Sequence, residues 1–438
     1  MAFRSYPTRA LRLVFRTLHA KQWLRIQWVA ALFAALSLYA IPAMAQDEVP
    51  GRSAESVRIW LLQRNPELHA LELEAEAARA RILPAGALPD PTAGITLRGV
   101  EPGQPWRGTE MGREVTYSLR QQFPLWGKRD LARSSARQAA DASDLERVAA
   151  IRDLFAEAES AYVRYWHADQ AVAVLDRRIA LLRQIEEIAG VRYALGLTAQ
   201  QDAIRAQVEQ TNLQRERIER RAVKREAIAT LNALLGRPAN ALLAAPASTP
   251  ILPVPVDGMA RSQQFMDHPA VLAQRARAEA ARTNAALQRR NRLPDVMLGL
   301  GVMQRGGGLD SLELMLEFEI PFQQRARRDR EREARLLEQA ALARVEGIQR
   351  GLEGRNAIAR SQWASARERR QLTDRILLPQ ADATYQSALA SYQVGEVDFG
   401  TLLEALNGWQ GADLARVDAL RDELLGAAAV RAVEGETP

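Results

Sequence analysis

The chain has 438 residues, with 59 lysines and arginines against 53 aspartates and glutamates, and it contains no cysteine. Six basic residues and no acidic residue lie in residues 1–45, so the remainder is near neutral and gives no reason to expect nucleic-acid binding. The absence of cysteine excludes disulfides, thiolate metal sites and a lipid-modified cysteine. The three later histidines, His69, His167 and His268, show no ligand spacing, and no nucleophile–base pattern appears. We therefore expect neither an enzyme nor a cofactor.

Residues 1–45 are interpreted as a signal peptide. An apolar run from Trp28 to Ile41 follows the basic residues, and Ala43-Met44-Ala45 has the A-x-A pattern of a cleavage site. The run is shorter than the roughly 18 residues expected of a membrane-spanning helix, although an N-terminal anchor is the alternative. The expected mature protein is exported.

The rest of the chain contains an internal duplication, which we divide into half-repeats 46–250 and 251–438. In each half a helix is followed by Leu-Pro-Asp, two strand-like segments, a proline, a long helix and Tyr-x-x-Gly. The matched landmarks lie about 200 residues apart, which is too long for a solenoid repeat. They are Asn65 and His268, Leu88 and Leu293, Pro124 and Pro321, and Tyr193 and Tyr392.

Each half is expected to form one long antiparallel helical hairpin. Residues 128–189 contain neither glycine nor proline, and their apolar residues follow the spacing of a coiled-coil seam. We predict helices at about 128–190 and 199–235 in the first half and at about 324–390 and 398–430 in the second. Pro379 should kink the third of these.

Four segments show the alternation of membrane strands. They are predicted at about 92–100, 114–123, 295–304 and 311–320, each long enough to cross a bilayer when tilted. Four strands cannot close a membrane barrel, so copies must share strands. A dimer would give eight strands and a trimer twelve; the trimer is preferred because the long helices must also close a wide tube. Polar positions of this alternation, and so candidates for the barrel lumen, are Arg98, Arg120, Glu313, Glu317 and Glu319. The alternative is a small soluble sheet packed on helices.

In the order of these features the chain resembles the TolC-like family of outer-membrane efflux channels. Three motifs are similar to those of its heavy-metal subgroup, the cobalt–zinc–cadmium and copper type: Asn65-Pro66-Glu67-Leu68, Leu88-Pro89-Asp90-Pro91 and Gln122-Phe123-Pro124-Leu125-Trp126-Gly127-Lys128-Arg129.

The resemblance implies a mainly α-helical protein with a small β part. Three copies would close a 12-stranded barrel in the outer membrane above a helical tunnel through the periplasm. The channel would be a passive conduit that works with a periplasmic adaptor and an inner-membrane pump, with heavy-metal cations as the expected cargo. The alternatives are a channel for drugs or other organic compounds and a periplasmic coiled-coil scaffold or adaptor.

The resemblance also implies roles for residues at the helical turns. Candidates for adaptor contact are Arg192, Tyr193, Gly196, Tyr392 and Gly395. Family members often close the periplasmic end with carboxylates six and nine residues after the second glycine, where this chain has Thr401 and Glu404. Asp202 holds the first of these positions in the other half, so the gate candidates are Glu404, Thr401 and Asp202. The family's arginine near this constriction is replaced by Val397.

Overall fold

The computed structural model describes residues 49–98, 114–196, 199–251, 262–306 and 308–434. The expected signal peptide, and residues 99–100 at the end of the first expected strand, lie outside the described residues. The chain divides into two compact units, Met1–Val49 and Pro50–Pro438, and every element named below belongs to the second unit.

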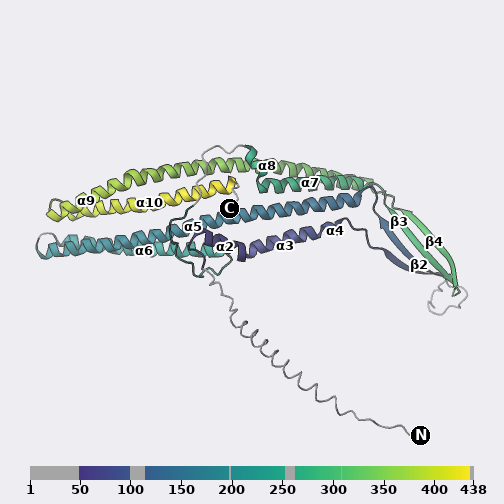
Figure 1. The fold of residues 1–438 in the computed structure, drawn as a ribbon, viewed down its shortest axis with the longest axis horizontal. Helices are drawn as coiled ribbons and strands as arrows, with labels where there is room; N and C mark the ends of the chain where they lie inside the picture. The colour runs from purple at the N-terminus through teal and green to yellow at the C-terminus, as the bar shows by residue number, and fades with distance from the viewer. Residues whose placement is uncertain (1–48, 99–113, 197–198, 252–261, 307, 435–438) are drawn as a thin grey trace, which may run out of the picture. The chain divides into compact units, whose positions relative to one another are not determined.

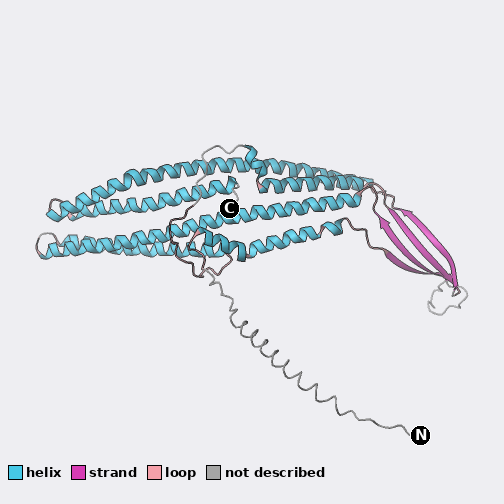
Figure 2. Ribbon diagram, viewed as in Figure 1, coloured by secondary structure: helices cyan, strands magenta, loops and turns pink. Residues whose placement is uncertain are grey.

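The two halves contain matching series of elements (Figures 1 and 2). The first half contains α2 (Ala54–Arg64), α3 (Pro66–Ala80), α4 (Ile82–Ala85), β1 (Thr92–Arg98), β2 (Glu114–Phe123), α5 (Lys128–Ala194) and α6 (Gln200–Leu234). The second contains η1 (Ser262–Asp267), α7 (Pro269–Arg290), β3 (Val296–Arg305), β4 (Gly308–Phe318), α8 (Gln324–Leu372), the π-turn η2 (Thr373–Leu377), α9 (Leu378–Val394) and α10 (Phe399–Glu434).

Helices α3 and α7 begin in the same way. The side chain of Asn65 accepts hydrogen bonds from the backbone of Glu67 and Leu68, and the ring of His268 accepts one from the backbone of Ala270. A proline follows each capping residue, where its missing N–H costs no helical hydrogen bond. The duplicated Asn-Pro and His-Pro dipeptides are thus helix starts.

The long helices bury a shared core between the two hairpins. Leu182 of α5, Leu213 of α6, Tyr385 of α9 and Leu402 of α10 belong to one buried cluster. Helix α5 has 67 residues and contacts α6, α7 and α10, so it connects the two halves along its length. The described helices include none long and apolar enough to cross a membrane.

The third long helix is interrupted at one place. Gly347, Gly351 and Gly354 all lie within α8, whereas a π-turn at Thr373–Leu377 separates α8 from α9. Pro379 follows at the start of α9. Because proline cannot donate a hydrogen bond to the preceding turn and its ring crowds the carbonyl four residues earlier, the irregular turn falls just before it.

The strands form one antiparallel sheet in the order β1-β2-β3-β4. The central pair joins the two halves, with Ser118 opposite Gly301 and Phe123 opposite Val296. A register shift between Met303 and Gln304 marks an irregularity in the β3–β4 pair. The sheet lies at one end of the helices and the hairpin turns lie at the other (Figure 1).

Candidate functional site

One face of the sheet is apolar and exposed across all four strands. Ala93, Leu119, Leu300 and Leu314 stand opposite one another in one cross-strand row, and the row of Ile95, Tyr117, Val302 and Leu312 is parallel to it. Leu314 is 82% exposed, Leu312 71% and Ile95 69%. Such a continuous apolar patch is unusual on a monomer in water and indicates contact with lipid or protein.

The opposite face is small, polar and crowded. One row on it contains Gly94, Ser118, Gly301 and Glu313. A Cβ atom at Gly299, on the same face, would lie 3.1 Å from Cγ of Arg120 and 3.2 Å from Cβ of Met315. Crowding on the polar face and exposure on the apolar face are expected of a sheet that curves towards its polar side, as a barrel wall does.

The predicted lumen residues divide into two groups. Arg98, Arg120, Glu313 and Glu317 are in strands, with Arg120 opposite Gly299 and Glu317 opposite Met297 on the polar face. Glu319 lies beyond the end of β4, where its Oε1 accepts a hydrogen bond from Nη2 of Arg327 at 3.1 Å. The fourth strand, predicted at about 311–320, ends at Phe318, and Glu319 is the next residue.

The outer strands each have one neighbour in the described sheet. Strand β1 pairs only with β2, and β4 pairs only with β3. Unpaired strand edges are costly in a membrane because their backbone groups have no water to bind. A membrane wall built from this sheet therefore needs strands from other copies.

The helices continue the sheet in the same order. Helix α4 precedes β1, α5 follows β2, α7 precedes β3 and α8 follows β4. Helix α5 contacts α3, α4 and α7, and α7 also contacts α8. The four strands and the helices joined to them thus form one continuous wall segment.

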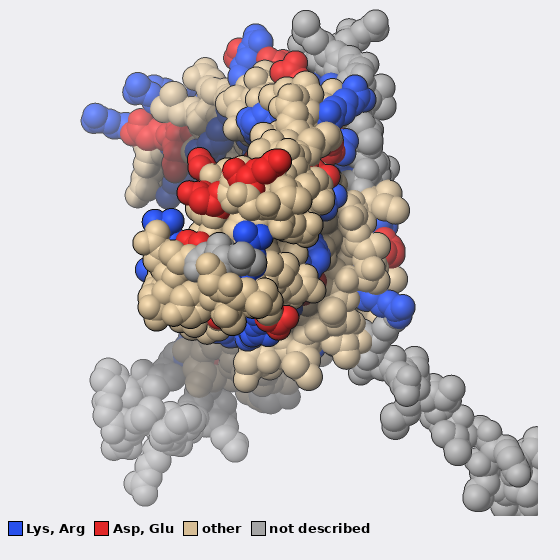
Figure 3. All heavy atoms as spheres, turned by 90° about the vertical axis from the view of Figure 1, so that its left-hand side faces the viewer, with Lys and Arg blue, Asp and Glu red and all other residues tan. Residues whose placement is uncertain are grey.

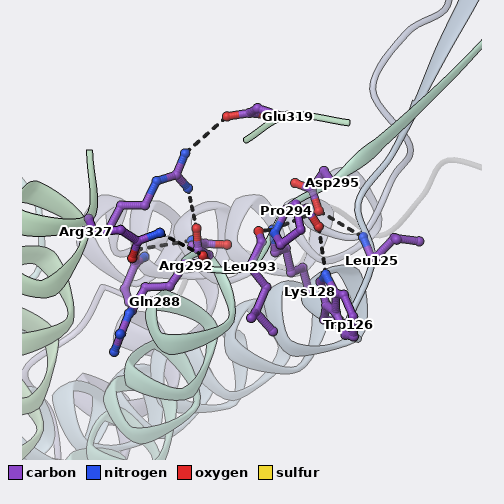
Figure 4. A network of polar contacts seen from close by, with 12 residues as sticks. Leu125, Trp126, Lys128, Gln288, Arg292, Leu293, Pro294, Asp295, Glu319 and Arg327 are labelled. Atoms are coloured by element: carbon purple, nitrogen blue, oxygen red, sulfur yellow. Dashed lines mark hydrogen bonds and ion pairs between the residues drawn. The ribbon is translucent and has the colours of Figure 1, made fainter. Parts of the chain in front are cut away.

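A polar network joins the two halves where strands meet helices (Figure 4). The buried Nζ of Lys128 lies 2.8 Å from Oδ1 of Asp295 and donates to the carbonyl of Leu293 at 2.9 Å. Nε1 of Trp126 donates to the carbonyl of Pro294 at 2.7 Å. The backbone of Leu125 donates to Asp295 at 3.0 Å. The Leu-Trp-Gly-Lys motif of one half is therefore held by the Leu-Pro-Asp motif of the other.

This contact was not predicted, although both motifs were recognised. The contacting segments are not equivalent positions of the two half-repeats: one follows β2 and the other precedes β3, and the pairing of Phe123 with Val296 brings them together. The turn itself is unusual: Trp126 has φ +62° and Gly127 has φ +70°. For tryptophan this left-handed conformation is rare, and the hydrogen bond to Pro294 stabilises it here.

At the other end, Arg192 joins the two hairpin turns. Its Nη1 donates to the carbonyls of Tyr392 and Gln393 at 2.9 and 3.0 Å, and its guanidinium lies 4.9 Å from the centre of the Tyr392 ring. The ring of Tyr392 is buried and meets Phe399 edge-on. Burial raises the pKa of Tyr392, with a further contribution from Asp202, while Arg192 opposes the shift.

The five candidates for adaptor contact therefore differ in accessibility. Tyr193 is exposed, whereas the ring of Tyr392 is covered. Gly196 and Gly395 have φ values of +72° and +85°, the left-handed conformation that ends a helix at glycine. The turn between α9 and α10 carries Glu396 and Asp398. Figure 3 shows an acidic patch on the face of the molecule at this end.

The gate candidates have distinct surroundings. Thr401 donates from its backbone and its hydroxyl to Oδ1 of Asp398, both at 2.8 Å, and these bonds lower the pKa of Asp398. Glu404 is exposed and lines an open groove between α9 and α10, together with Leu377 and Trp409. Asp202 lies in the first turn of α6. Within one chain the structure brings Asp202 near Tyr392, while Glu404 lies in the groove between α9 and α10.

Part of the sequence and the fold are similar to those of known proteins. Residues 60–237 match the model of the family described as Outer membrane efflux protein. The outer-membrane channel OprN has a structure similar to this chain, with a TM-score of 0.74, 20% identity and coverage of 88% of this chain and 90% of that one. This chain and OprN therefore share a fold.

Two further solved structures are also similar in fold to this chain. A membrane protein from Pseudomonas aeruginosa matches with a TM-score of 0.76 and 21% identity, covering 90% of this chain and 98% of that one. CusC, in a structure concerned with folding and transmembrane channel formation, matches with a TM-score of 0.76 and 17% identity over 88% and 92% of the two chains. No curated protein sequence matches this chain.

Proposed function

We propose that this protein is the outer-membrane channel of a tripartite efflux pump. The observation that carries the proposal is the four-stranded sheet with an exposed apolar face, a crowded polar face and two unpaired edges. A periplasmic scaffold with a soluble sheet would have no use for exposed apolar residues on the same face of every strand. The match of residues 60–237 to the efflux family supports the same conclusion.

The functional unit proposed is a homotrimer. Three copies would supply twelve strands, with β4 of one copy beside β1 of the next, and the helices would continue the barrel as a periplasmic tunnel. The hairpin turns would face the periplasm and meet an adaptor, through exposed residues such as Tyr193 rather than through the covered ring of Tyr392. Energy would be spent at the inner-membrane pump, and the channel itself would perform no chemistry.

The proposed periplasmic gate lies at the same end as these turns. Threefold symmetry would place three copies of Glu404 around the axis, and a ring of carboxylates there would favour cations. Thr401 contributes differently, because its hydroxyl holds Asp398 at the start of α10. Asp202 is the alternative source of charge.

Heavy-metal cations are the cargo that we propose, because three sequence motifs are shared with the metal-efflux subgroup. Organic compounds are the second candidate, since the lumen side carries charges of both signs, Arg120 and Glu313 among them. Neither the fold nor the family separates the two.

A resistance assay tests the cargo. A strain lacking this gene is exposed to zinc, cobalt, cadmium, copper and a panel of drugs, with and without the restored gene. Restored growth on metals alone supports metal efflux, whereas restored growth on drugs alone supports the second candidate. The channel function itself is tested by ion conductance of the purified protein in planar bilayers.

A further inference from the structure

A basic cavity opens where α7 ends and α8 begins. Its volume is ≈380 Å³, and Arg289, Arg290, Arg292, Leu293 and Gln324 line it. Three of these residues are arginines and none is acidic, which is the composition expected for an anion site.

Two of the arginines have no counter-ion among the described residues. Nη1 of Arg292 lies 3.0 Å from Oε2 of the buried Glu331, which also pairs with Arg335. Arg289 and Arg290 are exposed, and among the described residues no ion pair involves their guanidinium groups. Their charges are therefore available to a ligand.

The cavity lies close in the chain to the end of the apolar strand face. Leu316 and Phe318 are exposed on that face, and Phe322, four residues after the end of β4, is 87% exposed. Gln324, which lines the cavity, donates from its backbone to the carbonyl of Phe322 at 2.8 Å. An exposed aromatic ring thus stands between the apolar strand and the basic cavity in the chain.

A second cavity at the same junction has a different lining. Its volume is ≈140 Å³, and Lys128, Gln288, Asn291, Asp295, Arg327 and Arg330 line it. There Asp295 pairs with Lys128, and Arg327 pairs with Glu319. The lining of this cavity therefore contains a carboxylate, whereas the lining of the basic cavity contains none.

We propose that Arg289 and Arg290 bind the phosphate of an anionic phospholipid headgroup in the leaflet nearest the helices. This inference rests on the proposed function, because it requires the apolar face to lie in a membrane. Guanidinium groups bind phosphate oxygens in pairs, and basic pockets at membrane surfaces recognise anionic headgroups. The acyl chains would lie along Phe322 and the apolar strand face.

The test uses native mass spectrometry of the full assembled protein in detergent. Dissociation constants are measured for phosphatidylglycerol and for phosphatidylcholine of the same acyl chains, for the wild type and for Arg289→Gln/Arg290→Gln. The wild type is expected to bind phosphatidylglycerol more tightly than phosphatidylcholine. In the double variant the dissociation constant for phosphatidylglycerol should rise by about five- to twentyfold, and that for phosphatidylcholine should stay the same. The matched control, Arg221→Gln/Arg225→Gln, removes two exposed α6 arginines and should have no effect.

Equal affinity of the wild type for both lipids, or unchanged affinity in the double variant, overturns the proposal. Full displacement of phosphatidylglycerol by an equal concentration of inorganic phosphate also overturns it, because the cavity would then be a general anion site. Conductance of the wild type in planar bilayers is measured in parallel. If the wild type conducts ions but shows no lipid preference, only the lipid site is contradicted. If the wild type does not insert into the bilayer, the proposed function is contradicted.

Discussion

Arg192 is the residue that most directly couples the two hairpins at their turns. It donates to two carbonyls at the end of α9 and covers the ring of Tyr392. Carbonyls at a helix C-terminus lack partners within the helix, and a cation there is favourable. The contact spans residues two hundred positions apart, and only the folded structure reveals it.

Replacing Arg192 with glutamine should loosen this end of the protein. The loss of two charged hydrogen bonds and a cation–π contact is expected to destabilise the turn by about 2 kcal/mol. Hydrogen exchange should accelerate at residues 390–396 and remain unchanged in the sheet. The control Arg183→Gln removes an exposed arginine from the same helix. Unchanged exchange at residues 390–396 in Arg192→Gln would show that this contact contributes nothing.

A second coupling involves His167, which the sequence marked only as lacking ligand spacing. Its Nε2 lies 2.6 Å from Oδ1 of Asp418, and Arg421 donates to the same oxygen at 3.1 Å. The hydrogen bond from His167 is the largest cause that lowers the pKa of Asp418, with Arg421 adding to it and burial opposing it. The ionised carboxylate thus joins α5 to α10.

The pKa of Asp418 gives a pH prediction. Because this pKa is lower in the folded state, the carboxylate stabilises the fold above its unfolded value of about 3.9, and the contribution is lost as pH falls through the lowered pKa. Asp418→Asn should lower the free energy of unfolding by about 1 kcal/mol at pH 7, a value reduced for partial exposure. Thermal midpoints measured from pH 7 down to about 2 should converge with those of the wild type. A constant difference would contradict this role.

At the scale of elements, the helices were well predicted from residue patterns and their contacts were not. The absence of glycine and proline placed a helix at 128–190, and the structure gives Lys128–Ala194. The expected kink at Pro379 appears as a π-turn before the proline, a form that depends on how neighbouring helices support the freed carbonyls. Which helices approach closely is decided by small residues whose partners lie far away in the sequence.

Gly426 of α10 is such a residue. A Cβ atom there would lie 2.8 Å from Cα of Trp363 in α8, so Gly426→Ala must push the two helices apart. We expect a loss of about 1–3 kcal/mol in the free energy of unfolding. Gly411→Ala, in the same helix with nothing within 4 Å of the added atom, should instead stabilise by about 0.5–1 kcal/mol. Thermal melts of both variants measure the difference, and equal effects would contradict close α8–α10 packing.

The two faces of the sheet should differ in their tolerance of substitution. Leu314→Arg places a charge on the exposed apolar face and should impair membrane assembly by about 2–4 kcal/mol near the bilayer midplane. Glu317→Gln, on the polar face opposite Met297, should be tolerated. The yield of heat-resistant assembled protein in membrane fractions compares the variants. Equal tolerance would show that the apolar face does not meet lipid.

At the scale of the whole molecule, the duplication is what made the architecture predictable. Alternation predicted the two faces of each strand, and the cross-strand row of Leu119, Leu300 and Leu314 places the apolar faces on one side of the sheet. The order of strands and the junction between Lys128 and Asp295 needed the structure, because they depend on how the half-repeats meet.

The most direct test of the account is the arrangement of copies in a lipid environment. Electron cryo-microscopy of the purified full chain in lipid nanodiscs should show three copies closing one barrel of twelve strands, with β4 of each copy beside β1 of the next. The apolar rows that contain Leu314 and Leu312 should face the lipid, and α5 to α10 should extend from one end of the barrel. A particle whose sheets remain open, or whose apolar rows face an aqueous interior, would contradict the account.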